Sequence, residues 1–258
     1  FFEQILLLPN ANNDIKIDII INLAGESLAS GRWNKLRKAL FINSRLDTTK
    51  ALEQLINRLS IKPQTLINGS AIGYYGAQND NLLIESSDIN DCFSHQLCDK
   101  WEQSTRSIEK LGVRVCILRI GIVLGHDGGS LEPLSTPFEL GVNMTIGKGT
   151  QWMSWIHKDD LIRIILECIN NTKIDGAINA TAPNPVTNKE LSHELSQTLN
   201  TVINFSMPAK VLSLMVGEMA DELLLTGQRV VPHKLEQHHF KFVHSDISSA
   251  FKNIYQLR

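Results

Sequence analysis

KIDIIINLAGE, residues Lys16–Glu26, is a run of β-branched residues that ends in a short glycine turn. A run of this kind is typical of a strand that is buried on both faces of a parallel sheet. The pattern recurs at Thr65–Asn68 and, as VRVCILR, at Val113–Arg119. We therefore predict three buried strands in the first half of the chain.

Helical patterns separate these strands. Trp33–Leu59 carries leucine and isoleucine at helical spacing until Pro63 ends the pattern. Phe93–Leu111 shows the same periodicity and is followed by Gly112, a residue suited to ending a helix. The order strand, helix, strand, helix, strand requires long crossovers and hence parallel pairing. The fold class predicted is α/β, with a Rossmann-type doubly wound parallel sheet.

The second half of the chain is less regular. It contains helical patterns and short β-branched runs, without an internal repeat. We expect helices at Leu131–Leu140, Asp159–Asn170, Asn188–Leu199, about Lys210–Met219 and about Ser245–Asn253, and short strands at Thr145–Gly149 and Ala177–Ala180.

Composition excludes several classes of function. The formal net charge is −2 and no block of Lys and Arg is present, which argues against a nucleic-acid partner. No apolar run reaches the roughly 20 residues that a membrane helix needs. The four cysteines show no C-x-x-C and no metal-ligand spacing, so reduced thiols in a cytoplasmic protein and no metal site are expected.

Each predicted strand ends in a polar or glycine-rich turn. These turns are Asn22–Glu26, Gly69–Gly76 and Gly121–Gly125. In open parallel sheets, ligands bind outside the carboxyl ends of the strands, where such turns let backbone approach a ligand closely. A glycine after a strand is by itself only a turn, but three successive turns favour a ligand site at one edge of the sheet.

The same segments resemble a known family. INLAGE, GSAIGYYG, FSHQLCDKWE, LRIGIVLG, GGSL, WIHKDD, GAINATAPNPVTN and GQRVVP occur in order from Ile21 to Pro232. They are similar to landmarks of the YfcH-like atypical extended short-chain dehydrogenases, a group within the NAD-dependent epimerase/dehydratase family. The resemblance implies a Rossmann-type nucleotide-binding domain (1–125 and 150–182) and a smaller substrate-binding part (126–149 and 183–258). It also implies NADP, with NAD as the alternative.

The resemblance assigns cofactor contacts to the strand ends. The residues it implicates follow the first, second and third strands: Asn22, Ala24, Gly25, Glu26, Ser70, Arg119, Gly121, Ile122 and Val123. Glu26 is open to two interpretations, an acid/base group near the nicotinamide or a carboxylate that stabilises the turn. Ser70 is either a hydrogen-bond donor to the substrate's reacting oxygen or a cap of its strand.

Two features depart from the family pattern. Relatives begin with a G-x-x-G-x-x-G turn that holds the pyrophosphate at a helix N-terminus. Phe1–Asp14 contains no glycine, so we expect that the glycine-rich first βαβ unit is missing from this sequence. The Tyr-x-x-x-Lys pair of reactive relatives is also absent, and Ser94 and Cys98 stand in its place.

Four residues are candidates to replace the lost tyrosine. They are Ser70, Tyr74, Tyr75 and Cys98. For each the alternative is structural, because one of the two tyrosines is expected to pack in the core and a buried thiol is usually inert.

The substrate is expected to contact His157, Asp160 and Arg229. The alternatives are a helix cap for Asp160, a backbone hydrogen bond for His157 and a salt bridge for Arg229. The function predicted is an NAD(P)-dependent oxidoreductase or nucleotide-sugar-epimerase-like enzyme acting on a small molecule. A catalytically inactive NADP(H)-binding sensor or an inactive truncated product are the competing hypotheses. The sequence leaves open a monomer or a homodimer, in which the apolar residues around Leu214 would be core or a partner-facing surface.

Overall fold

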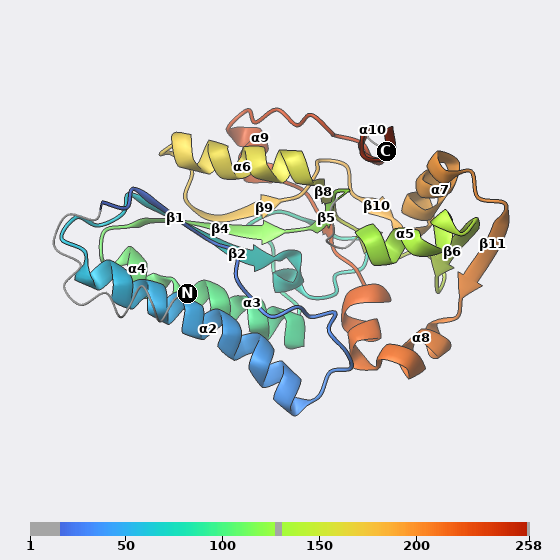
Figure 1. Ribbon diagram of the computed structural model, residues 1–258, viewed down its shortest axis with the longest axis horizontal. Helices are drawn as coiled ribbons and strands as arrows, with labels where there is room; N and C mark the ends of the chain where they lie inside the picture. The colour runs from blue at the N-terminus through green and yellow to red at the C-terminus, as the bar shows by residue number, and fades with distance from the viewer. Residues whose placement is uncertain (1–15, 127–130, 257–258) are drawn as a thin grey trace.

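The computed structural model describes residues 16–126 and 131–256 (Figure 1). Its centre is a four-stranded parallel sheet in the order β1-β2-β4-β9. The strands are β1 (Ile19–Asn22), β2 (Thr65–Ala71), β4 (Arg114–Ile120) and β9 (Gly176–Ala180). The parallel pairing predicted from the three β-branched runs is confirmed, and β9 extends the sheet. β2 and β4 are buried as predicted, but the prediction of a buried strand is wrong for β1, which lies at the edge of the described sheet with Ile21 49% exposed.

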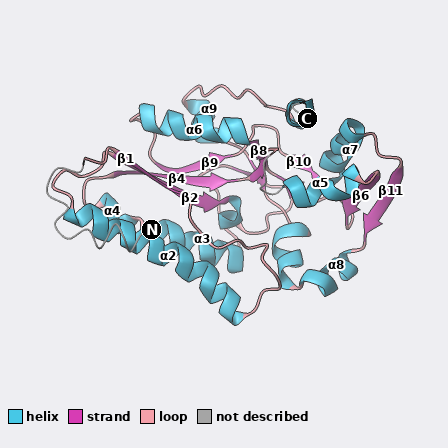
Figure 2. Cartoon of the chain, viewed as in Figure 1, coloured by secondary structure: helices cyan, strands magenta, loops and turns pink. Residues whose placement is uncertain are grey.

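Helices cover both faces of this sheet, as a doubly wound fold requires (Figures 1 and 2). One face carries α2 (Lys35–Arg58), α3 (Phe93–Ser104) and α4 (Arg106–Glu109). The other carries α6 (Lys158–Asn170) and α9 (His233–Gln237). The α2 helix starts where the Asn34 side chain accepts a hydrogen bond from the Arg37 backbone. A parallel sheet with helices on both faces defines the Rossmann-like α/β class, so the predicted fold class is confirmed.

The remaining elements form short pairs beside the sheet (Figure 1). Parallel pairs join β5 (Ile122–Leu124) to β8 (Trp155–His157), β6 (Val142–Ile146) to β11 (Ile203–Met207), and β3 (Leu82–Leu83) to β12 (Arg229–Val230). An antiparallel pair joins β7 (Trp152–Met153) to β10 (Val186–Thr187). The other helices are η1 (Ile72–Tyr75), α5 (Leu131–Glu139), α7 (Asn188–Leu199), α8 (Ala209–Val216), the π-helix η2 (Ala220–Leu224) and α10 (Ile247–Gln256).

Several boundaries differ from the prediction for physical reasons. The strand expected to break at Gly69 continues to Ala71. The single helix expected over Phe93–Leu111 is interrupted at Thr105, whose hydroxyl donates to the Glu102 carbonyl. The strand expected at Thr145–Gly149 lies instead at Val142–Ile146, where it pairs with the distant β11.

Two large apolar clusters hold these layers together. One lies between the sheet and α6 and contains Leu118, Ile164 and Ile178. The other is built around Trp155 and Phe251 and joins α5, α7, β8 and α10. Among the described residues, no helix is both long and apolar enough to cross a membrane.

Candidate functional site

The carboxyl ends of the four parallel strands bring most of the sequence-predicted residues to one edge. The register pairs Asn22 with Asn68, Ser70 with Arg119, and Arg119 with Asn179. Asn22 donates from its amide to the Asn68 side-chain oxygen at 2.7 Å, a buried bond that joins the ends of β1 and β2. Polar side chains therefore run across the edge of the sheet.

A buried polar network lies beneath this edge. Ser70 donates from its hydroxyl to Glu102 on α3 at 2.7 Å. Arg119 donates from Nε and Nη2 to the two Glu102 oxygens, each at 2.9 Å, in the bidentate geometry that suits a carboxylate. Arg119 also donates to the Tyr75 hydroxyl at 3.0 Å, and that hydroxyl donates to Asn179 at 2.7 Å. One hydrogen-bond network thus joins Ser70, Tyr75 and Arg119.

The electrostatics of this network favour a fixed charge pair and a neutral phenol. Burial alone would lower the pKa of Arg119, but its hydrogen bonds and attraction to Glu102 raise that pKa above its ordinary value. Burial raises the pKa of Tyr75, against the opposing effect of Arg119. Tyr75 is completely buried. Its phenol therefore serves as a hydrogen-bonding core group, whereas Tyr74 is only half-buried and stacks on the Arg119 guanidinium at 3.4 Å.

Cys98 lies on α3 behind the network. It is buried, and desolvation together with the Glu102 charge raises the pKa of its thiol to about 12. The thiolate is the reactive form of cysteine, so a thiol with this pKa is almost entirely protonated near neutral pH.

The turn after β1 is the most accessible part of the edge. Leu23, Ala24 and Gly25 are exposed, and the Ala24 N–H donates to the Asn22 side chain at 3.3 Å. Glu26 accepts hydrogen bonds from Ser30 and Arg37, which corresponds to the turn-stabilising interpretation of this carboxylate. The exposed turn at Leu23–Gly25 leaves room for a ligand that lies across the edge.

The turn after β4 is packed more closely. A Cβ on Gly121 would lie 2.6 Å from the Ser154 carbonyl oxygen, so glycine is needed here for backbone packing. The Ile122 N–H donates to that same oxygen at 2.8 Å, and Val123 pairs with Ile156 in the β5–β8 ladder. The side of this turn that faces Ser154 is therefore closed.

His157 and Asp160 stand at the start of α6, away from the Glu102 network. The His157 ring caps the helix by accepting the Asp159 N–H at 3.1 Å. Burial and the neighbouring His244 lower the pKa of His157, although Asp159 opposes this. Asp160 is completely buried and accepts the N–H groups of Val243 and His244. These contacts favour a structural role for Asp160. That role differs from the helix cap considered above, because the carboxylate anchors a distant segment of the chain.

Arg229 begins β12 and is half-buried. Its guanidinium lies 4.5 Å from the ring centre of Trp152, and its buried Nε has no hydrogen-bond partner. An arginine that stacks on an aromatic ring and has an unpaired N–H donor can bind an anionic group.

Three polar residues escaped the sequence reasoning. Glu102 and Asn179 belong to the buried network, and Glu222 on η2 accepts the Phe93 and Ser94 N–H groups at the start of α3. Ser94 also donates its hydroxyl to Glu222 at 2.7 Å. Glu102 stood within the FSHQLCDKWE segment and Asn179 within GAINATAPNPVTN, but their roles depend on contacts between distant residues. Glu222 contacts a residue 128 positions away, and no local pattern marks it.

Comparison of the sequence with known protein families identifies the family of this chain. Residues 8–180 match the model of the NAD dependent epimerase/dehydratase family, and residues 207–254 match a domain of unknown function, DUF1731. The chain belongs to the NAD dependent epimerase/dehydratase family.

Named relatives cover most of the chain. Epimerase family protein Mb2239 of Mycobacterium bovis is 36% identical over 242 residues, which cover 94% of this chain and 79% of that protein. YfhF of Bacillus subtilis is 35% identical over 239 residues, covering 92% and 78%. The crystal structure of human SDR39U1 (isoform 2) with NADPH superposes with a TM-score of 0.90 at 27% identity, covering 99% of this chain and 86% of that one.

Proposed function

We propose that the chain binds NADP(H) across the carboxyl edge of its sheet and acts as an NAD(P)-dependent oxidoreductase or epimerase-like enzyme on a small molecule. The observation that carries this proposal is the exposed turn Leu23–Gly25 beside the polar strand ends of β2 and β4. The human relative crystallised with NADPH supports NADP(H) over NAD(H). Asn22, Ala24 and Gly25 would contact the cofactor, with Gly121 to Val123 on the neighbouring turn.

The chemistry would come from the cofactor, and the protein would orient it. In this proposal the Glu102–Arg119 pair, with Ser70 and Tyr75, holds the strand ends in place. Of the four catalytic candidates, Tyr74 is the one that is partly exposed, because Ser70, Tyr75 and Cys98 are all buried. Arg229 would receive an anionic group of the substrate in the C-terminal part of the chain. The four free cysteines support a cytoplasmic location.

A charge placed on the exposed turn tests cofactor binding. NADPH and then NADH are titrated into the chain while nicotinamide fluorescence is followed. Ala24→Glu should weaken NADPH binding about tenfold or more, because the new carboxylate meets a dinucleotide that carries several negative charges. Ala29→Glu is the matched control, since Ala29 is exposed in the same loop and outside the edge. Absence of saturable binding by the folded chain, or equal weakening by both variants, would contradict the proposal.

A catalytically inactive NADP(H)-binding sensor is the second candidate. The observation in its favour is that no Tyr-x-x-x-Lys pair exists and that the Cys98 thiol is buried with a raised pKa. The two functions separate in a turnover assay with NADPH and a panel of carbonyl substrates. An oxidoreductase would oxidise NADPH at a rate that Tyr74→Phe reduces. An epimerase-like enzyme, which consumes no cofactor overall, would instead convert a nucleotide sugar to its epimer, and a sensor would bind NADPH and do neither.

A further inference from the structure

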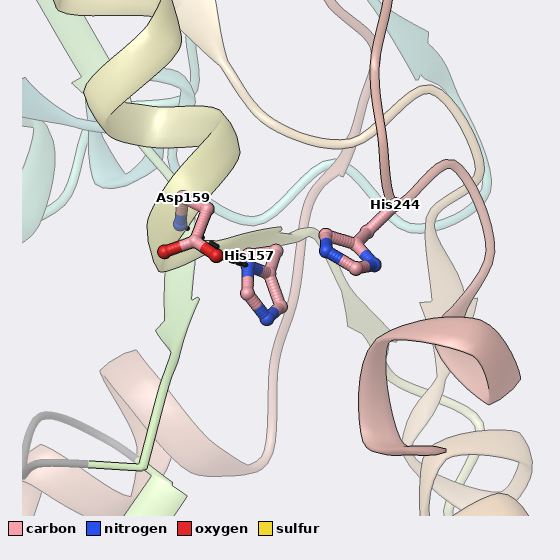
Figure 3. Close-up of side chains that lie close together, drawn as sticks. All are labelled: His157, Asp159 and His244. Carbon is pink, nitrogen blue, oxygen red and sulfur yellow. Dashed lines mark hydrogen bonds and ion pairs between the residues drawn. The ribbon is translucent and has the colours of Figure 1, made fainter. Parts of the chain in front are cut away.

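His157, Asp159 and His244 form a cluster at the start of α6 (Figure 3). One ligand atom from each residue lies within 4.8 Å of the others. His157 is 3% exposed and His244 7%, whereas the Asp159 side chain is 59% exposed. Two buried imidazoles therefore meet one carboxylate that can move.

The fold holds the two histidines together. The completely buried Asp160 accepts the His244 N–H at 2.8 Å and the Val243 N–H at 3.0 Å. Arg163 pairs with the same carboxylate at 2.8 Å. This anchor fixes the segment before α10 against the first turn of α6, so the cluster does not depend on chance contact between loops.

The nitrogen of His157 that faces Asp159 carries a lone pair. Nδ1 accepts the Asp159 N–H at 3.1 Å and lies 3.9 Å from Asp159 Oδ2. The neutral ring therefore has its proton on Nε2, which is buried. His157 and Asn253 both line a cavity of about 260 Å³. A cation bound through Nδ1 would take the lone pair that now accepts the Asp159 N–H, so metal binding would replace this helix-capping hydrogen bond.

We propose that His157, Asp159 and His244 bind one late first-row divalent metal ion of the Zn²⁺ class. Two imidazole nitrogens and one carboxylate oxygen suit such an ion better than Mg²⁺ or Ca²⁺, which prefer oxygen ligands. With three protein ligands, a fourth position stays open for water or another small ligand. The cavity that His157 and Asp159 line is also lined by Gly125, His126 and Lys158.

Modest rearrangement brings the ligands together. Ligand atoms around tetrahedral Zn²⁺ are about 3.4 Å apart, given bond lengths near 2.1 Å, so the present separations need to shrink by at most roughly 1.4 Å. The exposed Asp159 can rotate, and the His244 ring, now 3.9 Å from the His157 ring at 33°, must turn out of this stack. The N-terminus of α6 and Lys158 oppose a cation, and the negative charge of Asp159 offsets part of this effect, since Arg163 already neutralises Asp160.

Metal binding is measured on the full chain without a histidine tag. Equilibrium dialysis against Zn²⁺, followed by elemental analysis, should find one ion per chain. Co²⁺ should give d–d absorption of a four- or five-coordinate site without the charge-transfer band of a thiolate ligand, which excludes the four cysteines. Zn²⁺ should also raise Tm, because the ion binds only the folded chain and links α6 to the segment before α10.

Two variants remove ligands while preserving the fold. His244→Phe keeps a ring stacked on His157 but has no nitrogen, and Asp159→Asn keeps the size of its side chain. Each should weaken Zn²⁺ binding at least about tenfold and abolish the Co²⁺ spectrum. His193→Ala, an exposed histidine on α7, should bind as the unchanged chain does. Absence of a stoichiometric ion, or retention of binding by His244→Phe and Asp159→Asn with an unchanged Tm before metal is added, overturns the proposal.

Discussion

Glu102 is the central residue of the buried network, because it joins α3 to two neighbouring strands. Its carboxylate accepts hydrogen bonds from the Ser70 hydroxyl on β2 and from Nε and Nη2 of Arg119 on β4. A buried ion pair adds little net stability over an apolar pair of the same size, but the loss of one partner leaves a charge uncompensated. Substitution of either Glu102 or Arg119 alone is therefore expected to destabilise the fold.

Glu102→Gln tests this constraint. The neutral amide leaves Arg119 without a countercharge, and we expect the free energy of unfolding to fall by about 3 kcal/mol. Urea unfolding followed by circular dichroism measures the change. Glu109→Gln, an exposed glutamate on the adjacent α4, should change stability by less than about 0.5 kcal/mol. A Glu102→Gln protein as stable as this control would show that the pair contributes nothing.

Cys98 yields a second prediction at the same scale. With its pKa raised to about 12 and its side chain buried, Cys98 should not react with iodoacetamide in the native chain at pH 8. Cys92, which is half-buried, should be the first thiol to react. Peptide mapping by mass spectrometry identifies the labelled residue, and labelling in urea should reach all four cysteines. Rapid native labelling of Cys98 would restore it as a catalytic candidate.

At the scale of elements, the sequence predicted what local patterns control. The buried strands β2 and β4 and the helices α2, α6 and α7 lie close to where periodicity and end signals placed them. The errors arise from contacts between distant residues. β2 runs through Gly69 because the missing side chain makes room for Trp101, and β6 is displaced because its partner β11 lies far along the chain.

The candidate site follows the same division. Asn22 and Ser70 could be found because they end β-branched runs, and both lie at the carboxyl edge of the sheet. The role of Glu102 and the meeting of His157 with His244 could not be found, because they depend on how α3 and the C-terminal segment fold back onto the sheet.

Glu222 links the C-terminal part of the chain to α3 and predicts a pH dependence. Burial alone would raise the pKa of this carboxyl, but hydrogen bonds from Ser94 and Phe93 outweigh burial and lower it. A carboxyl with a lowered pKa in the folded state stabilises above its unfolded pKa, and this contribution is lost as the pH falls through the folded value. Glu222→Gln should therefore cost roughly 1–2 kcal/mol at pH 7, toward the low end because the group is half-exposed.

The test compares Glu222→Gln with the unchanged chain in urea at pH 7 and at successively lower pH. The difference in stability between the two proteins should begin to shrink as the pH falls below about 5, where an unperturbed glutamate begins to protonate, and should be lost below the lowered pKa of folded Glu222. Asp221→Asn alters the neighbouring carboxylate, which is exposed on the same helix, and should show a smaller difference at pH 7. A difference independent of pH would mean that the charge of Glu222 is irrelevant to the link.

At the scale of the whole molecule, the expected division into two parts is crossed by a shared core. The cluster around Trp155 unites β8, which belongs to the expected nucleotide-binding part, with α7 and α10 of the expected substrate-binding part. Because apolar contacts stabilise both parts at once, neither can lose its packing without exposing the other. We therefore expect the chain to unfold in one cooperative transition.

Phe251→Ala measures how far this cooperativity extends. Phe251 is completely buried in the shared cluster, and its truncation should lower the free energy of unfolding by about 3–5 kcal/mol. Hydrogen exchange in a urea series, read by mass spectrometry, should show peptides from β4 and from α7 shifting to the same lower midpoint. Leu214→Ala on α8, where the side chain is 76% exposed, should leave both midpoints nearly unchanged. If the α7 peptides shifted while those of β4 kept their midpoint, the two parts would be separate folding units, and a ligand at the carboxyl edge would stabilise only the first of them.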